Sequence, residues 1–335
     1  MEGLILPDSY KPALSVRETQ KAVTFTKDIA VKKITEALGI TMIPSPVIVT
    51  QASGVNDDLN GVERKVHFTM ANVDGTGEVV QSLAKWKRMA LGVYGYEPGE
   101  GIVTNMSAIR RDDSCDTLHS IYVDQWDWEK AISREDRTVD YLKDTVRKIV
   151  GALADVKDAV NAEYPVLKNT VNRDVHFITT QELEDLYPSL NPKERENAIT
   201  KEYGTVFVMQ IGDILKSGKK HDGRAPDYDD WKLNGDILLW NEVLNCAEEV
   251  SSMGIRVDEF SLPEQLKKAH AEERINLPFH QGIMTGKYPL SIGGGIGQSR
   301  VCMFMLEKAH IGEVSVSIWP DEMAEKCKAH GIALL

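Results

Sequence analysis

The chain has 335 residues, a hydrophobic fraction of 42% and a formal net charge of −12 at pH 7. No run approaches the roughly 18 apolar residues of a membrane-spanning helix, and the first residues lack the basic-then-apolar order of a signal peptide, so we expect a cytoplasmic protein without membrane association. A generally acidic surface disfavours binding of nucleic acid, although a local cluster of arginines can still bind a small anion such as a nucleotide.

The N-terminal region is predicted to form a helix followed by an interrupted strand. Apolar residues recur at helical spacing over residues 17–38, and Gly39 is placed to end the helix. Residues 40–50 are mostly apolar but contain two prolines. Because proline lacks a ladder donor, this strand is expected at a sheet edge or at a subunit boundary.

A turn-rich loop and a basic helix follow. Residues 54–61 form the loop, where Asp57 and Asp58 are typical of solvated turn residues. Residues 65–70 alternate like a strand, and residues 78–88 run from a strand end into a helix. The cations of that helix are typical of a solvated face.

The most patterned segment is predicted to be a hairpin. Residues 102–110 form one strand, residues 111–116 a polar loop, and residues 118–128 the returning strand. Period-two geometry places Gln125 and Asp127 on one face of the second strand and both tryptophans on the other. This pattern indicates a pocket floor with specific donors and acceptors, although an amphipathic edge strand gives a similar pattern.

The next hundred residues alternate core elements with polar loops. A clear apolar stripe predicts a core helix over residues 145–160. Residues 219–231 are dense in charge and contain Pro and Gly, which indicates a long functional loop. Short buried strands are predicted at residues 174–179 and 205–209, residues 234–240 turn into a strand, and residues 248–258 are predicted to be a strand-pair region. No internal repeat or linker interrupts the chain, so we expect a single domain over residues 1–335.

The stretch Ser291–Arg300 contains four glycines in five residues. Glycine costs about 0.5 to 1 kcal/mol relative to alanine inside a regular element, so the run needs a ligand or a chain segment packed against it. The apolar run of residues 301–306 follows at once. We predict a loop that leads into a buried helix, with Arg300 in its first turn and its N-terminal amide groups facing an anion. The Rossmann and Walker spacings are absent, and close helix packing is an equally open interpretation.

Three of these segments, in this order, resemble the signature motifs of class II aminoacyl-tRNA synthetases: a helix with a Pro-bearing strand, an arginine hairpin, and a glycine-rich strand followed by a helix with arginine. Within that superfamily the chain is similar to ammonia-dependent asparagine synthetase over almost its whole length. The similarity lies in residues 80–88, 122–129, 224–231 and 293–300.

The resemblance implies an α+β fold, with a mainly antiparallel sheet flanked by helices and no anticodon-binding domain. It also implies a homodimer with the Pro46 region at the interface. The implied reaction makes L-asparagine from L-aspartate, ammonia and ATP, with Mg²⁺ as cofactor. A β-aspartyl-adenylate would form first, and AMP and pyrophosphate would be released.

The resemblance and the chemistry of the side chains together suggest the site residues. The catalytic candidates are Asp57, Arg110 and Gln125. The candidates for binding the substrate amino acid are Lys87, Asp127, Tyr228, Asp229, Ser252 and Arg256. The candidates for binding ATP are Arg110, Gly294, Gly295 and Arg300, and those for Mg²⁺ are Asp236 and Glu249.

Two other functions stay open at this point. The chain could be the catalytic core of an aspartyl- or asparaginyl-tRNA synthetase, against which stand its acidic charge and the lack of a basic domain. It could also be a non-catalytic paralogue that binds an amino acid or an adenylate. Such a protein would be expected to lose catalytic arginines or metal-binding acids, and here those positions are filled.

Overall fold

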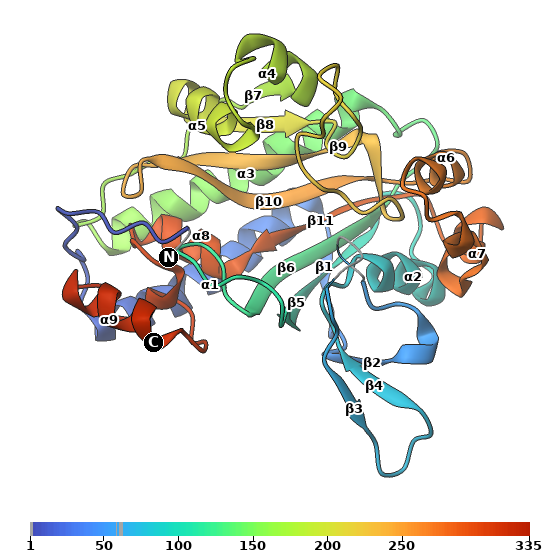
Figure 1. Cartoon of the computed structure of the whole chain (residues 1–335), viewed down its shortest axis with the longest axis horizontal. Coiled ribbons are helices and arrows are strands. Elements are labelled where there is room, and N and C mark those ends of the chain that lie inside the picture. The colour runs from blue at the N-terminus through green and yellow to red at the C-terminus, as the bar shows by residue number, and fades with distance from the viewer. Residues whose placement is uncertain (1–2, 58, 60–62) are drawn as a thin grey trace.

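The fold is built on one large sheet, seen in a computed structural model that describes residues 3–57, 59 and 63–335. Its eight strands lie in the order β1-β5-β6-β11-β10-β9-β8-β7 (Figure 1). All neighbours pair antiparallel except β1 with β5 and β7 with β8 at the two edges. The strands are β1 (Thr41–Met42), β5 (Gly101–Ile109), β6 (Tyr122–Ala131), β7 (His176–Thr179), β8 (Thr205–Met209), β9 (Asp229–Asn241), β10 (Cys246–Arg256) and β11 (Ser291–Gly297).

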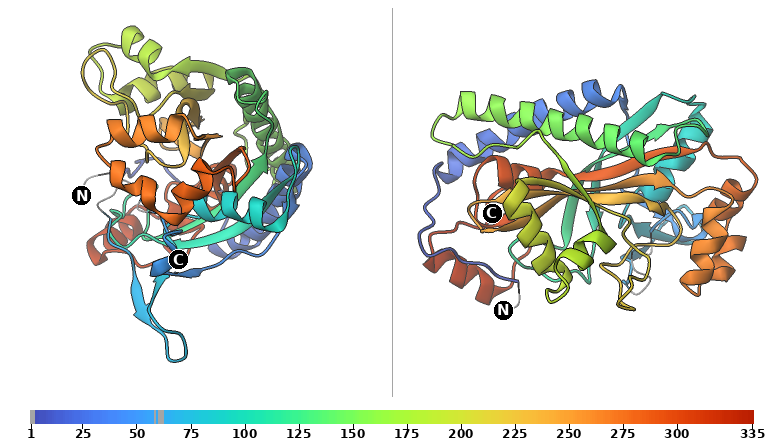
Figure 2. Two further views of the ribbon diagram at one scale, coloured as in Figure 1. Left: turned by 90° about the vertical axis from the view of Figure 1, so that its right-hand side faces the viewer. Right: turned by 90° about the horizontal axis from the view of Figure 1, so that it is seen from above.

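A second, three-stranded sheet projects from the body of the molecule (Figures 1 and 2). Its order is β2-β4-β3, with both pairs antiparallel. The strands are β2 (Ile48–Thr50), β3 (His67–Thr69) and β4 (Thr76–Val79). The proline-bearing run of residues 40–50 therefore forms two short strands in two sheets, with β1 at an edge as the prolines predicted.

Helices surround the large sheet. The α-helices are α1 (Val16–Leu38), α2 (Ala84–Tyr94), α3 (Val139–Glu163), α4 (Thr180–Leu186), α5 (Pro192–Tyr203), α6 (Ser261–Lys268), α7 (Pro278–Met284), α8 (Gln298–Met305) and α9 (Asp321–Ala329). The 3₁₀ helices among the described residues are η1 (Gln51–Ser53), η2 (Glu272–Asn276) and η3 (Ile311–Glu313). None of the described helices is long and apolar enough to cross a membrane.

Helices α1 and α3 lie side by side along one face of the sheet (Figure 2). A capping box between Ser15 and Glu18 begins α1, and Gly39 ends it in the left-handed conformation, as predicted. The apolar stripe of α3 is buried as predicted, and the helix itself extends beyond the predicted range on both sides. We call the side of the sheet under these helices the helix face.

Side-chain alternation divides the central strands into two surfaces. On β6, Trp126 and Trp128 are buried in the main core with residues of α1 and α3. Gln125, Asp127 and Glu129 therefore point to the opposite side, which we call the site face. Strand β6 begins four residues after the predicted start, but the predicted alternation is confirmed.

The glycine-rich run is a strand, which corrects the predicted loop. Strand β11 pairs with β6 from Ser291 to Gly297 and with β10 from Ile292 to Ile296. It therefore lies in the middle of the sheet, where both of its edges are hydrogen-bonded. Helix α8 follows at once, with Arg300 in its first turn as predicted.

Candidate active site

A cleft with about 960 Å³ of empty space opens on the site face. It is lined by residues of β6, β10 and β11, by the start of α2 and by the loops before β6 and β9. Every predicted site residue except Asp236 lines this cleft, so the fold brings together side chains that are up to 243 positions apart (Asp57 to Arg300). The predicted residues in the lining are Asp57, Lys87, Arg110, Gln125, Asp127, Tyr228, Asp229, Glu249, Ser252, Arg256, Gly294, Gly295 and Arg300.

The glycines of β11 give room to polar side chains of the neighbouring strand. A Cβ at Gly295 would overlap Oε1 of Gln125, and a Cβ at Gly293 would overlap Oε2 of Glu129. On the opposite face, a Cβ at Gly294 would lie 2.7 Å from the carbonyl oxygen of Ser252. The glycine run is therefore required because polar groups and backbone pack directly against it.

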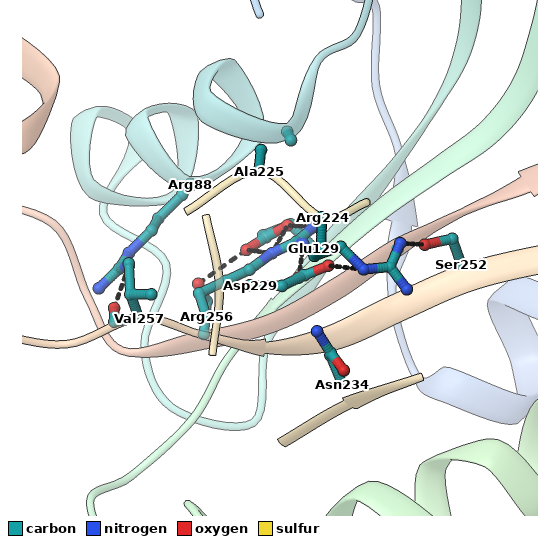
Figure 3. A network of polar contacts seen from close by, with 12 residues as sticks. Arg88, Glu129, Arg224, Ala225, Asp229, Asn234, Ser252, Arg256 and Val257 are labelled. Carbon is teal, nitrogen blue, oxygen red and sulfur yellow. Dashed lines mark hydrogen bonds and ion pairs between the residues drawn. The ribbon is translucent and has the colours of Figure 1, made fainter. Parts of the chain in front are cut away.

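A buried arginine network forms the floor of the cleft (Figure 3). The Nε and Nη2 atoms of Arg256 donate to both carboxylate oxygens of Glu129 at 2.8 to 3.2 Å, and its Nη1 donates to Asp229. The hydroxyl of Ser291 also donates to Glu129, at 2.7 Å. Although burial alone would raise the pKa of Glu129, the Arg256 guanidinium holds it below its usual value. Glu129 therefore stays ionised and fixes the position of Arg256.

The cations at the start of α2 are buried, which corrects the predicted solvated face. Lys85, Lys87 and Arg88 are each at most 2% exposed. Nζ of Lys87 is paired with Asp127 and also donates to the carbonyl oxygen of Gly294 at 3.2 Å. Burial lowers the pKa of Lys87 and raises that of Asp127, and the attraction between the two charges opposes both shifts.

Two arginines, Arg110 and Arg300, line the cleft, and most of their guanidinium N–H groups donate to none of the described residues. Nε of Arg110 donates to the carbonyl oxygen of Gln81 at 3.1 Å, and Nη1 of Arg300 donates to that of Glu249 at 2.9 Å. Both side chains are about a fifth exposed. Two guanidiniums with free donors on one cleft are suited to binding phosphate and carboxylate oxygens.

The N-terminus of α8 is occupied by a side chain of the protein. The amide of Ser299 donates to Oδ1 of Asp124 at 2.9 Å, and the Ser299 hydroxyl donates to the same atom at 2.6 Å. The predicted anion at this helix start is therefore the Asp124 carboxylate, whose other oxygen lies 2.7 Å from Nζ of Lys27. Arg300 remains the cation that this helix presents to the cleft.

Asp57 lies at the wall of the cleft and is only 1% exposed, which corrects its interpretation as a solvated turn residue. Its Oδ1 accepts from the amide of Leu59 at 3.2 Å. Burial raises its pKa, and the nearby Lys85 opposes that shift. The neighbouring Asp58 lies outside the described residues.

The predicted magnesium ligands lie on neighbouring strands but differ in surroundings. Oδ1 of Asp236 on β9 is 2.6 Å from Nη2 of Arg224, whereas Glu249 on β10 reaches the cleft. Burial raises the pKa of Asp236 to about 7, with Arg224 opposing and Glu249 adding to the shift. Among the described residues, no group of three or more His, Cys, Asp or Glu side chains is arranged to hold a metal ion. Two carboxylates nonetheless fit Mg²⁺ that arrives with nucleotide phosphates, although each has a competing cation: Arg224 for Asp236, and Arg300, 3.7 Å away, for Glu249.

The sequence reasoning missed Glu129 and Arg224 as parts of the site. Glu129 follows Gln125 and Asp127 at period two, so the same alternation places it on the site face. Nη1 of Arg224 donates to the Ser252 hydroxyl (Figure 3). Its Nη2 donates to Oδ1 of Asp236. The contacts of Arg224 depend on how the long loop before β9 folds, and no sequence period describes that loop.

The comparisons with known proteins agree with this geometry. The model of the protein family described as aspartate-ammonia ligase matches residues 17–331. The aspartate–ammonia ligase of Bacillus cytotoxicus is 57% identical over 97% of this chain and 99% of its own length. That of Lactobacillus acidophilus is 57% identical over 99% of both chains. The chain belongs to the aspartate–ammonia ligase family.

Solved structures similar to this family member identify the fold. An asparaginyl-tRNA synthetase of Entamoeba histolytica, in complex with asparaginyl-adenylate, has a TM-score of 0.64 at 17% identity. The match covers 90% of this chain and 66% of the synthetase. The asparaginyl-tRNA synthetase of Pyrococcus horikoshii has a TM-score of 0.64 at 16% identity, over 90% and 70% of the two chains. The predicted α+β fold of a class II synthetase core is confirmed.

Proposed function

We propose that this protein is an aspartate–ammonia ligase that makes L-asparagine from L-aspartate, ammonia and ATP. It would proceed through a β-aspartyl-adenylate and release AMP and pyrophosphate. The family membership supports the reaction, and one structural observation carries it for this chain. Arg110 and Arg300 present free guanidinium donors to a cleft whose floor holds the buried pair of Lys87 and Asp127.

The first step joins two anions, so charge neutralisation is its main requirement. An oxygen of the aspartate side-chain carboxylate attacks the α-phosphorus of ATP, and pyrophosphate leaves. Arg110 is our candidate for contacting both the carboxylate and the α-phosphate, because a planar guanidinium can donate to two oxyanions at once. Donors already in position stabilise the charge that develops in the transition state. Arg300 would hold another part of the nucleotide.

The substrate amino acid would be held by the polar groups of the floor. Arg256 is fixed by Glu129 and Asp229 and is suited to a carboxylate of the substrate. Asp127, Gln125, Tyr228 and Ser252 offer oxygens and an amide that can orient the substrate ammonium and the carboxylate to be activated. Reacting groups held in register account for much of the acceleration in such reactions.

Asp236 and Glu249 are our candidates for holding Mg²⁺. When it is bound with ATP, this ion shields the charge of the leaving pyrophosphate. The contribution of the chain is to bring two carboxylates to adjacent strands, where Glu249 of β10 pairs with Leu238 of β9, two residues from Asp236. Arg224 would have to release Asp236 for both acids to share one ion.

In the second step, ammonia attacks the carbonyl carbon of the adenylate. The carbon–nitrogen bond forms, the bond from that carbon to the phosphate oxygen breaks, and AMP leaves with the proton that the nitrogen gives up. Because ammonium has no lone pair, it must first give up a proton, and Asp57 is our candidate acceptor at the cleft wall.

We also propose a homodimer that uses the region around Pro46. Val47 and Ile48 next to this proline are 52% and 51% exposed, at the base of the projecting sheet. Exposed apolar neighbours of this kind favour association. Sedimentation would then give twice the mass of the 37.4 kDa chain. The cytoplasmic location and the single catalytic domain stay predictions.

The deciding experiment measures the products of ATP with the purified protein, aspartate and Mg²⁺. We expect AMP and pyrophosphate in equal amounts, and asparagine only when ammonium is present. ADP and phosphate, or the absence of asparagine, would reject the proposal. Charging of radiolabelled aspartate or asparagine onto tRNA would instead support the synthetase alternative.

A further inference from the structure

The carboxylate of Asp57, at the wall of the cleft, and the carboxamide of Gln81 are neighbouring groups that we together call the niche. Gln81 is fully buried between β4 and α2, and its Nε2 donates to the carbonyl oxygen of Asp57 at 3.1 Å. Oε1 of the same carboxamide and Oδ2 of Asp57 are both buried. Neither oxygen has a hydrogen-bond donor among the residues that the structure describes.

The backbone around the niche is held rigidly. The amide of Gln81 donates to Oδ1 of Asn56 at 2.9 Å. Nδ2 of Asn56 in turn donates to Glu78 Oε2 and to the carbonyl oxygen of Val79, both at 3.0 Å. The two unpartnered oxygens are therefore on residues that neighbouring hydrogen bonds already fix in place. A buried acceptor without a donor is costly, roughly 1–3 kcal/mol, so the two oxygens call for a ligand that donates.

We infer that Oε1 of Gln81 and Oδ2 of Asp57 together bind the ammonium ion that supplies the nitrogen of asparagine. This inference rests on the proposed ligase function and assigns Gln81 as a further substrate-binding residue. Ammonium has four donors and no acceptor, which matches two acceptor oxygens of which one belongs to a carboxylate.

The position of the niche suits the second step of the reaction. The carbonyl oxygen of Gln81 accepts from Nε of Arg110 at 3.1 Å, so the niche lies next to the guanidinium that would hold the activated carboxylate. Ammonium gives one proton to Asp57, and the resulting ammonia attacks the adenylate carbonyl carbon. AMP leaves as the carbon–oxygen bond breaks, and its phosphate takes the second proton from the nitrogen. The competing cation nearby is Lys85, whose Nζ lies 3.0 Å from Oδ2 of Asp227 and thus has a carboxylate partner of its own.

The test compares Gln81→Met with Gln81→Glu. Methionine keeps the length of the side chain but removes the acceptor, so we expect the KM for ammonium to rise about tenfold or more, with the KM values for aspartate and ATP changed less than twofold. Glutamate restores an acceptor but not the Nε2 donor, and should return the KM for ammonium to within about threefold of the original protein. If Gln81 only braced Asp57 through Nε2, both variants would be impaired alike, and that result would overturn the inference.

Two further measurements separate this inference from the proposed function. Gln51 lies on the surface of η1 in the same region, so Gln51→Leu is the matched control and should leave the KM for ammonium unchanged. Thermal unfolding in ammonium chloride, against equal sodium chloride, reports binding without turnover. The original protein should gain a few degrees in ammonium and Gln81→Met should gain none. Equal gains would overturn the ammonium site even in a protein that makes asparagine. Unequal gains without asparagine formation would instead reject the ligase proposal and leave a site that only binds ammonium.

Discussion

The two faces of the central sheet are built from the same strands, but one face packs apolar side chains and the other buries charged ones. On the helix face, Trp126, Trp128 and Met253 pack with α1, α3 and α8 in one apolar core. On the site face, Glu129 and Arg256 of the same strands are equally buried but form ion pairs. Apolar packing lowers the free energy of the fold directly, whereas a buried ion pair roughly offsets its own desolvation. The helix face therefore supplies most of the stability of the fold, and the charged residues of the site face serve the reaction.

This division predicts that Arg110→Ala will have the largest effect on the reaction and almost none on the fold. Arg110 is partly exposed and accounts for one described hydrogen bond, to the carbonyl oxygen of Gln81. Loss of a preorganised donor to the transition state costs about 10²–10³-fold in rate. Aspartate-dependent exchange of pyrophosphate into ATP should fall by that factor, while the Tm stays within about 2 °C. Near-normal exchange would remove Arg110 from the mechanism.

Trp128→Ala should show the reverse pattern. Trp128 is fully buried on the helix face, and truncation of a buried Trp costs about 3–5 kcal/mol of unfolding free energy. The protein that remains folded should keep the KM values for aspartate and ATP within about twofold, because the side chain points away from the cleft. Chemical denaturation measures the first quantity and steady-state kinetics the second. A large rise in KM without loss of stability would contradict the division between the faces.

Stability should also depend on pH through Glu248 at the hairpin end of β10. Burial raises its pKa to about 7 from an ordinary 4.5, although Nδ2 of Asn241 donates to its carboxylate at 2.7 Å. As pH rises from 4.5 to 7 the unfolded chain loses this proton first, so the folded state loses up to about 3 kcal/mol. Glu248→Gln keeps an acceptor for Asn241 and removes the titration. Denaturation midpoints of the two proteins should agree at pH 4 and separate by pH 8, with the variant more stable.

The smallest effects should come from two adjacent glycines of β11 that face opposite ways. A Cβ at Gly294 would press on the backbone oxygen of Ser252, so Gly294→Ala should destabilise the fold by about 1–3 kcal/mol. A Cβ at Gly295 would instead displace the mobile end of the Gln125 side chain. Gly295→Ala should therefore cost less than about 1 kcal/mol in stability but raise the KM for aspartate several-fold. If the two variants shift Tm and KM equally, the faces are not separable at this strand.

Much of the fold followed from periodicity. The apolar stripes of α1 and α3 and the hairpin of β5 and β6 were predicted because a buried helix or strand repeats its pattern along the chain. The same alternation predicted which residues of β6 face the cleft. The glycine run was wrongly predicted as a loop, since an isolated glycine-rich segment shows no period, and only its pairing with β6 and β10 makes it a central strand.

The burial of the charged residues was decided by tertiary structure. Lys87 in a basic helix and Asp57 in a polar loop have the local sequence of solvated residues, yet both are buried at the cleft. Their burial depends on partners far away in the chain, such as Asp127 for Lys87. A charge can leave water only where such a partner or a ligand compensates it, and local composition does not record that partner.

The sequence by itself thus determined the residue types of the site, the alternation of β6 and, through its resemblance to asparagine synthetase, the family and the fold. Only the tertiary structure decided that Glu129 fixes Arg256, that Arg224 pairs with Asp236, and that Gln81 stands behind Asp57 with an oxygen lacking a described donor. The physical reason is the distance along the chain over which each property is determined. Hydrophobic period is a local property of the chain, whereas the pairing of buried charges is settled by which distant strands and loops the fold brings together.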